Sequence, residues 1–294
     1  MINHSFFIIG VALLFACASP TENDNLNTNG QSKFPDLNIE NGVEIVTWNI
    51  ENFPKAGTQT IDSVAKIIRG LNADIYCLQE ISNEATFNQL NEKLDGYSSV
   101  YSTSTEYLNL AILFKDEIIT FRNQSSILTD HNYEFAYRPP LRTEFIFQGE
   151  PSIEFTIINI HLKCCDDGFD RRIASAELLY NYLLESSTAG VVNQIVAGDW
   201  NDDISDNANV NSFNMFINDT SNFRFVTWDL ANSDSDLYDS YPSYPSFIDH
   251  ILISSDLFDE DNDGDVQTIR LGDYISGYDE IISDHRPIVW RFSP

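Results

Sequence analysis

An aspartate and an asparagine stand two residues apart, directly after a short apolar run. The run is residues 195–197, Gly198 follows it, and the polar pair is Asp199 and Asn201. An apolar run of this kind predicts a buried strand, and a glycine lets the chain turn sharply at its end. Side chains at i and i+2 of extended backbone face the same side, so both can enter one pocket. Their oxygens suit a hard divalent cation or a phosphoryl group; the alternative is an ordinary strand-end turn.

Other predicted strands also end in side chains that can bind a cation or move a proton. Each of these strands carries or adjoins such a residue: Asn49 at strand 43–50, Glu80 after strand 75–78, His161 in strand 154–162, Asp249 and His250 in strand 247–254, and Asp284 and His285 before strand 288–292. Alternation along 154–162 places Asn159 and His161 on one face. His250 points away from the face of Asp249, so we interpret it as a core histidine. Each residue alone would be an ordinary turn or core residue, but together they predict one site.

Segments with helical spacing alternate with these strands. We predict helices at 60–71, 84–94 and 169–185, and a short regular piece at 212–217. Further strands are predicted at 108–114 and 118–122, and a pair of strands within 133–148. The corner of that pair is Arg138-Pro139-Pro140, which presents one arginine. The alternation of strands and helices predicts a layered α/β fold with its site along one sheet edge.

The charge balance limits the partners of the protein. The formal net charge of the 294 residues is −29, and no lysine or arginine occurs from Phe225 to Ile269. This charge argues for a soluble exterior and against a protein that docks on nucleic acid through a broad basic face. A polyanionic substrate is not excluded, because bound cations can reverse the sign of the charge locally. We interpret the stretch without basic residues as a solvated acidic surface.

The N-terminus predicts export. Residues 6–16 are apolar but too few to span a bilayer, as in a signal peptide. The four residues that end at Cys17 resemble a bacterial lipobox, which implies that Cys17 is lipidated and anchors the protein in the cell envelope. A plain secretory signal with an incidental Cys17 is the alternative. We predict a signal peptide at 1–17, a disordered polar tether at 18–41 and a folded domain at 42–294.

The other cysteines fall into two kinds. Cys77 lies in an apolar run and is predicted to be a small core residue. Cys164 and Cys165 are adjacent, so they form either a strained ring disulfide in an oxidising compartment or two free thiols.

Six short motifs carry a resemblance to a known family. They are TWNIENF, LQE, NIHLK, GDWND, IDHILIS and SDHRP, and they occur in this order from Thr47 to Pro287. The set resembles the endonuclease/exonuclease/phosphatase superfamily, the DNase I-like metal-dependent phosphoesterases. The resemblance implies a four-layered α/β sandwich, in which two packed mixed β-sheets are flanked by helices.

The resemblance also implies roles for the residues of the metal site. Glu80 corresponds to the principal Mg²⁺ ligand, with Asn49 and Asp284 beside it, and Mn²⁺ is an alternative metal. Asp199 and Asn201 correspond to the pair that orients the attacking water, or that holds a second metal and the phosphate.

The remaining roles concern the phosphate and the leaving group. His285 corresponds to the histidine on the phosphate, and Asp249 fixes its tautomer. His161 corresponds to the second catalytic histidine, on the leaving-group side, and Arg138 to a phosphate-binding arginine. These roles also agree with general chemistry, because histidines near neutral pKa move protons or donate hydrogen bonds and a carboxylate partner fixes which ring nitrogen faces the substrate.

A separate acidic stretch copies the start of a calcium loop. Asp259, Asp261, Asp263 and Gly264 have the required spacing, but the twelfth position is Arg270 instead of a bidentate glutamate. A complete EF-hand is excluded, and the alternatives are a partial surface Ca²⁺ site or an acidic loop.

These observations predict a metal-dependent phosphodiester hydrolase, a nuclease that cleaves exported or extracellular nucleic acid. One alternative is a phosphoesterase of the sphingomyelinase or inositol-phosphatase type, and another is an inactive surface binding module. Substrate choice is expected to lie in residues 202–246, whose aromatic residues either stack on bases or pack the loop down: Trp228, Tyr238, Tyr241 and Tyr244. We expect a monomer with nucleic acid as a transient partner and with no protein partner.

Overall fold

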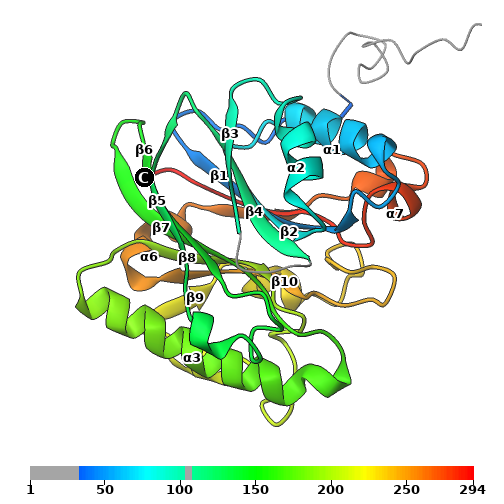
Figure 1. Ribbon diagram of the computed structural model, residues 1–294. Helices are drawn as coiled ribbons and strands as arrows, with labels where there is room; N and C mark the ends of the chain where they lie inside the picture. The colour runs from blue at the N-terminus through cyan, green and yellow to red at the C-terminus, as the bar shows by residue number, and fades with distance from the viewer. Residues whose placement is uncertain (1–32, 103–107) are drawn as a thin grey trace, which may run out of the picture.

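The computed structural model describes residues 33–102 and 108–294. The predicted signal peptide, with Cys17, and most of the predicted tether lie outside the described residues. Two six-stranded sheets pack face to face in the described part of the chain, with helices on the outer face of each (Figure 1). The four-layered α/β sandwich is confirmed.

Both sheets are mixed. The first contains, in spatial order, β11 (Asp265–Thr268), β12 (Ile288–Phe292), β1 (Val43–Phe53), β2 (Ile75–Ile81), β4 (Asn109–Lys115) and β3 (Tyr97–Tyr101). The second contains β5 (Ile119–Ser126), β6 (Leu141–Phe147), β7 (Ile153–His161), β8 (Gln194–Asp199), β10 (Asp249–Ser254) and β9 (Phe223–Phe225). Each has a parallel pair near its centre, β1 with β2 and β7 with β8, and the other neighbours pair antiparallel.

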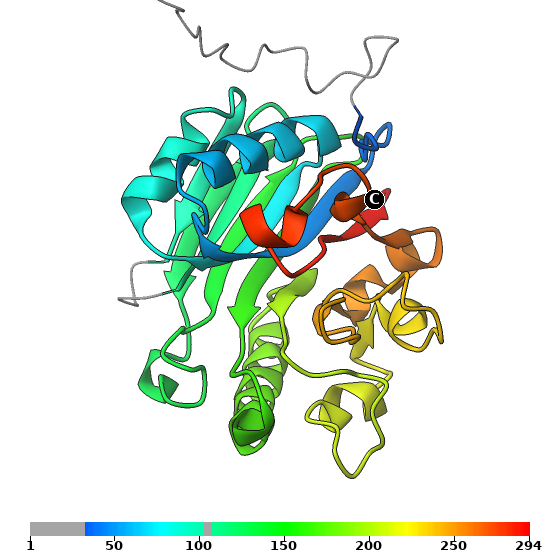
Figure 2. The same cartoon turned by 90° about the vertical axis from the view of Figure 1, so that its right-hand side faces the viewer.

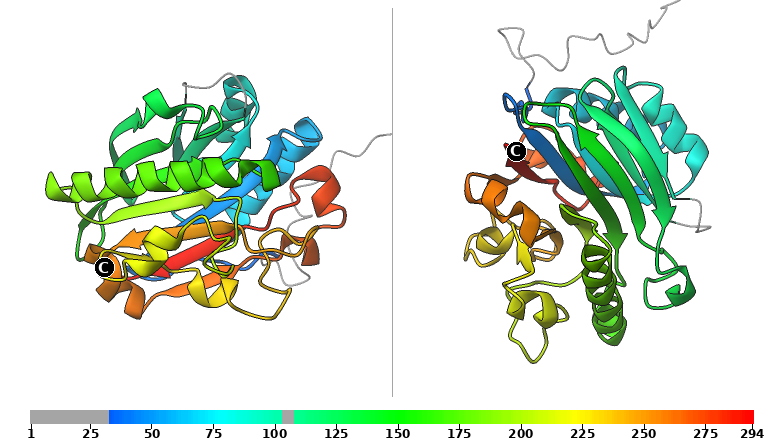
Figure 3. Two further views of the ribbon diagram at one scale, coloured as in Figure 1. Left: turned by 90° about the horizontal axis from the view of Figure 1, so that it is seen from below. Right: turned by 90° about the vertical axis from the view of Figure 1, so that its left-hand side faces the viewer.

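Helices surround the two sheets. They are α1 (Thr58–Leu71), α2 (Glu84–Asn91), α3 (Phe169–Thr188), α4 (Asn214–Asn218), α5 (Trp228–Ala231), α6 (Phe258–Asn262) and α7 (Tyr278–Ile281). Short 3₁₀ turns are η2 (Thr129–His131), η3 (Asp166–Gly168), η4 (Ser255–Leu257) and η5 (Leu271–Asp273). Helices α1 and α2 lie over the first sheet, and α3 lies across the second, as the view from below shows (Figure 3, left).

Alternation along the strands explains the layers. On β1, Ile45 belongs to the apolar cluster between the sheets, whereas Val46 and Trp48 belong to the cluster beneath α1. Side chains of period two must divide in this way when both faces of a strand are covered. The same division holds on β8, where Ile195 faces the first sheet and Val196 packs with the apolar side of α3.

The predicted pair of strands within 133–148 is wrong. Only β6 is a strand there, and the preceding residues form turns after η2. Ala136 and Tyr137 both have positive φ, at 53° and 62°, which is incompatible with extended backbone. The short strands β3 and β11 were not predicted, because each has few apolar residues and pairs only at a sheet edge.

The packed structure begins before the predicted boundary at residue 42. Phe34 and Leu37 are buried in the cluster beneath α1, and Leu37 N–H donates to Leu71 O at 2.8 Å. The described end of the predicted tether is therefore part of the domain. Among the described residues, no helix combines the length and the apolar character needed to cross a membrane.

A buried pair of carboxyl groups makes stability depend on pH. Glu44 is fully buried; Ile39 N–H donates to its Oε1 at 2.6 Å, and its own N–H donates to Asp74 Oδ2 at 3.3 Å. Burial and the neighbouring Asp74 raise the pKa of Glu44 from 4.5 to about 8. Between these two values the folded chain holds a proton that the unfolded chain has lost. Stability should therefore fall as pH rises, by about 1.4 kcal/mol per pH unit for this proton.

Replacing Glu44 with glutamine should remove this component, because the amide is neutral at every pH in the range. The free energies of unfolding of the wild type and Glu44→Gln, from urea titrations between about pH 5 and about pH 8, test the expectation. The free energy of unfolding of Glu44→Gln minus that of the wild type should increase as the pH rises. Two parallel profiles would show that Glu44 is not protonated in the folded protein.

Candidate active site

The predicted site residues converge on one groove at the ends of the strands. The groove has a volume of about 870 Å³ and is lined by Glu80, Arg138, His161, Asp199, Asn201, Asp284 and His285, among others. Asn49 and Asp249 lie buried beside it. The structure thus brings together all the predicted site residues within its described part, although their separation in sequence is large.

Strand register explains the convergence of three of these residues. His161 on β7 is the parallel partner of Asp199 on β8, and Asp199 is the antiparallel partner of Asp249 on β10. Partners in register face the same side of a sheet. Gly198 lets these strands meet, because a Cβ at this position would lie 2.1 Å from Ile160 O.

Asp199 is the central group of the site. Its Oδ2 accepts a hydrogen bond from Asn49 Nδ2 at 2.9 Å, which joins the two sheets across the groove. The same oxygen lies 3.3 Å from His161 Nε2 and 3.9 Å from His285 Nε2. Burial and the nearby Asp249 raise the pKa of Asp199 to about 7. A carboxyl group of this pKa can accept or release a proton near neutrality.

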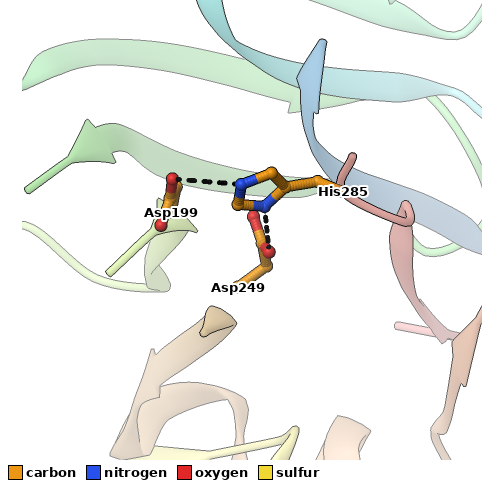
Figure 4. A group of neighbouring side chains, drawn as sticks. All are labelled: Asp199, Asp249 and His285. Carbon is orange, nitrogen blue, oxygen red and sulfur yellow. Dashed lines mark hydrogen bonds and ion pairs between the residues drawn. The ribbon is translucent and has the colours of Figure 1, made fainter. Parts of the chain in front are cut away.

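His285 lies between two carboxylates (Figure 4). Its Nδ1 is 2.8 Å from Asp249 Oδ2, and its Nε2 faces Asp199. Burial acts to lower the pKa of His285, but Asp249, Asp199 and Asp284 outweigh burial and raise it to about 10. The ring is therefore protonated at neutral pH, with Nδ1–H donated to Asp249 and Nε2–H directed towards the groove.

His161 has the opposite electrostatic character. Burial, Arg138 and the charge of His285 lower the pKa of His161 well below its usual value, so the ring is neutral at neutral pH. Arg138 is held against the end of β7, where its Nε donates to His161 O at 3.1 Å and its Nη2 to Leu162 O at 2.8 Å. Asn201 Nδ2 donates to the same Leu162 oxygen at 3.1 Å. Leu162 O therefore fixes both Arg138 and Asn201 at the groove.

Glu80 and Asn49 are positioned by irregular backbone. The register of β1 with β2 shifts between Asn49 and Phe53, and that of β2 with β4 shifts between Leu78 and Ile81. Glu80 has φ 65°. Bulges and positive φ of this kind redirect side chains and are frequent at functional sites. The result is that Glu80 Oε1 accepts from Asn49 Nδ2 at 3.2 Å, and Glu80 Oε2 from Asn52 N–H at 2.8 Å.

The segment that carries Asp284 and His285 is tied to β1. Ser283 Oγ donates to Asn49 O at 2.6 Å and accepts from His285 N–H at 2.9 Å. Beneath it, Tyr278 OH donates to His285 O at 2.6 Å and accepts from Trp48 Nε1 at 3.0 Å. These hydrogen bonds hold His285 independently of its charge partners.

The site has the composition of a cation site. Donor atoms of Asp199, Asp249 and His285 lie within 4.8 Å of one another. Because His285 is already hydrogen-bonded to Asp249, the groove-facing Glu80 and Asp284 are the more available ligands. Asp284 Oδ1 is buried and has no hydrogen-bond partner among the described residues, and burial raises the pKa of Asp284. A divalent cation would give Asp284 Oδ1 a partner and would compensate its buried negative charge. The residues present therefore fit a bound metal.

The groove as a whole is strongly acidic. Eight of its lining residues are Asp or Glu, whereas its only Lys or Arg residues are Arg138 and Arg172. The Arg172 guanidinium is already paired with Asp202 at 3.1 Å. A phosphate group cannot enter such a groove favourably unless cations compensate the carboxylates.

Sequence reasoning missed several residues of the groove. Glu51 Oε2 accepts the N–H of Asp284 at 3.0 Å, and Arg172 on α3 donates to Lys163 O and Cys165 O, both at 2.9 Å. Glu51 lies within the TWNIENF motif, which was the available signal. Arg172 had none, because one arginine in an amphipathic helix looks like a surface residue.

Among the four candidate aromatic residues, only Tyr241 and Tyr244 line the groove. The Tyr241 ring lies against His285, with ring centroids 4.9 Å apart, and Tyr244 is 76% exposed. Trp228 lines a separate apolar depression with Phe216.

The other predictions about single residues have clear outcomes. His250 is a buried core residue, between Thr227 Oγ1 at 3.2 Å and Asp202 O at 3.1 Å. Cys77 is buried, and burial raises the pKa of its thiol. Cys164 and Cys165 are free thiols at the rim of the groove, with sulfurs 2.8 Å apart.

The partial calcium loop is not formed. Asp259 and Asp261 lie on α6, where residues two apart point about 200° away from each other. Asp261 Oδ2 is paired with Arg224 Nη1 at 2.8 Å. The stretch is therefore an acidic helix end with its own counter-charge, and no Ca²⁺ site is expected there.

Two mixed sheets with a groove of carboxylates and histidines at their strand ends define an α/β sandwich with a candidate active site. The family model described as Endonuclease/Exonuclease/phosphatase family matches residues 46–285. The chain therefore belongs to the endonuclease/exonuclease/phosphatase family. A sequence comparison with curated proteins finds no match.

Solved structures share the fold. Truncated TDP2 of Caenorhabditis elegans is 19% identical, with a TM-score of 0.64 over 86% of this chain and 98% of that one. The human Nocturnin catalytic domain, with bound sulfate, is 19% identical, with a TM-score of 0.63 over 88% and 96%. TDP2 of D. rerio, complexed with a single-strand DNA product, is 16% identical, with a TM-score of 0.66 over 87% and 100%.

Proposed function

We propose that the chain is a metal-dependent phosphodiesterase, and that it acts as a nuclease. The observation that carries the proposal is the arrangement of His285, Asp199 and His161 in one groove. A protonated histidine, a carboxyl group with a pKa near neutrality and a neutral histidine stand next to one another. Hydrolysis of a phosphodiester requires a donor to the phosphate, a base for water and a group at the leaving oxygen.

The residues divide these tasks by their protonation. His285 Nε2–H donates to a non-bridging oxygen of the phosphate, while Asp249 holds the ring through Nδ1. Asp199 takes the proton of the attacking water, and its other oxygen, Oδ1, is fixed by Asn201 N–H at 2.9 Å. Neutral His161 faces the leaving oxygen. Glu80, Asn49 and Asp284 would hold a divalent cation, which would supply the charge neutralisation that this acidic groove lacks.

Nucleic acid is the substrate class that the groove supports best. The groove has a volume of about 870 Å³, and exposed Tyr244 among its lining residues offers a stacking surface. The likeness in fold to a TDP2 solved with a single-strand DNA product supports this choice. Export, with an anchor at Cys17, is a further proposal that rests on the apolar run of residues 6–16.

The proposal predicts metal-dependent cleavage that requires His161. Plasmid and oligonucleotide digestion by the purified chain, with Mg²⁺, Mn²⁺ or EDTA, is compared with the variant His161→Ala. We expect cleavage with either metal, none with EDTA, and a loss of about 100-fold or more in the variant. Hydrolysis of a chromogenic bis-phosphodiester without any cleavage of nucleic acid would move the substrate to lipids or small phosphoesters. If the chain hydrolyses neither nucleic acid nor the chromogenic substrate, the enzymatic proposal is overturned.

A further inference from the structure

Two exposed tyrosines and an arginine form a cluster beside the groove, which we call the Tyr133 platform: Tyr133, Tyr137 and Arg171. Tyr133 is 58% exposed and Tyr137 64% exposed, and both lie in the segment between η2 and β6. The guanidinium of Arg171, on α3, stacks on the Tyr133 ring at 4.2 Å and lies 6.0 Å from the Tyr137 ring. Arg171 Nη2 also donates to Tyr133 O. The catalytic machinery uses none of these three residues.

The platform is held in place by the backbone beneath it. Phe135, between the two tyrosines, is fully buried in the cluster under α3. Tyr137 N–H donates to Asn132 O at 2.6 Å, and Arg138 N–H donates to Phe135 O at 2.9 Å. Tyr137 keeps φ 62°, a conformation that costs a bulky residue free energy. The fold therefore fixes Tyr137 facing water and next to Arg138.

The charges of this region differ from those of the rest of the protein. In a chain of net charge −29, Arg138 and Arg171 have no carboxylate within ion-pair distance among the described residues. Burial lowers the pKa of Arg138, and the charge of Arg171 adds to this effect, while Asp199 and Glu80 oppose it. One end of the acidic groove therefore has two arginines without an ion-pair partner among the described residues, beside two exposed rings.

The platform adjoins the groove, because Tyr137 and Arg171 are the chain neighbours of two lining residues, Arg138 and Arg172. Figure 2 shows the segment that leads into β6 and the segment that leads into β10 on opposite sides of α3, at the end of the sandwich where the strands finish. A nucleic-acid strand bound across the catalytic centre would run between these two segments.

We propose that the Tyr133 platform binds the nucleotide next to the scissile phosphate in a single-stranded substrate. Its base stacks on Tyr137 and Tyr133, and its phosphate pairs with Arg171. Aromatic rings stack on any base, and arginine binds phosphate while it stacks on an aromatic face. A paired base cannot leave its own stack at low cost, so the platform favours unpaired nucleic acid over duplex. This inference rests on the proposed nuclease function and adds the substrate class to it.

Binding tests the platform without turnover. A fluorescein-labelled oligothymidylate is titrated with the full chain carrying His285→Ala, alone and together with Tyr133→Ala and Tyr137→Ala, in the presence of Mg²⁺. Stacking on one aromatic ring contributes about 1–3 kcal/mol, so affinity should fall about tenfold or more. Tyr274→Ala is the matched control, because this half-exposed tyrosine does not line the groove. Arg171→Gln should weaken binding. It should also reduce the slope of log affinity against log salt concentration by about one, the value of one phosphate contact.

Kinetics on two substrates separate the platform from the catalytic centre. In the otherwise wild-type chain, Tyr133→Ala with Tyr137→Ala should lower kcat/KM on the oligonucleotide about tenfold and leave hydrolysis of a chromogenic bis-phosphodiester unchanged. Equal losses of kcat/KM on both substrates would overturn the proposal that the platform binds a nucleotide. Unchanged affinity together with unchanged cleavage of the oligonucleotide would also overturn it. A wild type that hydrolyses neither substrate would refute the nuclease proposal, and the binding titration would still decide whether the platform holds a nucleotide.

Discussion

Replacing His285 with alanine should lower kcat by about two to four orders of magnitude. The variant loses the protonated Nε2–H that faces Asp199 and the phosphate position, and among the described residues His285 is the ion-pair partner of Asp249. Asp249 Oδ1 already lacks a hydrogen-bond partner among the described residues. The variant therefore leaves a buried carboxylate uncompensated and should also unfold at a lower temperature. Initial rates of oligonucleotide cleavage and a thermal unfolding curve measure the two effects.

Asp249→Asn distinguishes chemistry from loss of structure. It keeps the shape of the side chain but removes the charge that does most to raise the pKa of His285. The pKa of the histidine should fall, so that His285 loses its proton at lower pH. If protonated His285 is the active form, the alkaline limb of the activity profile moves to lower pH in this variant. His131→Ala, at a half-exposed histidine outside the groove, should have the rate and the pH profile of the wild type. An alkaline limb that stays in place in Asp249→Asn would exclude His285 as the proton-bearing group.

The strand ends could be predicted from the sequence because two local rules suffice for them. Apolar runs identify the strands, and a period of two identifies the face of a side chain such as His161 or Asp249. Neither rule shows which strand lies beside which. The register that places Asp199 between these two residues depends on pairings between β7, β8 and β10. The resemblance of the motifs supplied that arrangement, and the pairing confirms that it is physically consistent.

The irregular parts of the site could not be predicted in the same way. Glu80 reaches the groove because β2 is bulged and φ is positive, and nothing in LQE requires a bulge. The sequence predicted a strand at Tyr137, but the buried Phe135 and the contact of Tyr133 with Arg171 hold this segment in turns. In each case tertiary contacts override the local preference. The same contacts create the features that distinguish this groove from an ordinary sheet edge.

Removing divalent cations should abolish activity, and Glu80→Gln should raise the Mg²⁺ concentration needed for half-maximal rate by about tenfold or more. Eight acidic residues line the groove against two arginines, so a phosphodiester meets net repulsion until cations bind. Glutamine keeps the size of the side chain and one acceptor oxygen, which can serve Asn52 N–H or Asn49 Nδ2 but not both, so the variant removes the charge with little change in shape. Cleavage rates over a Mg²⁺ titration measure the shift, and Glu84→Gln, at the start of α2 and outside the groove, is the matched control. Because the cation compensates the carboxylates as a set, Glu80→Gln should raise the metal requirement more than it lowers the rate at saturating metal. Activity that persists in EDTA, or a metal requirement identical in both variants, would mean that the carboxylates of the groove do not hold the cation.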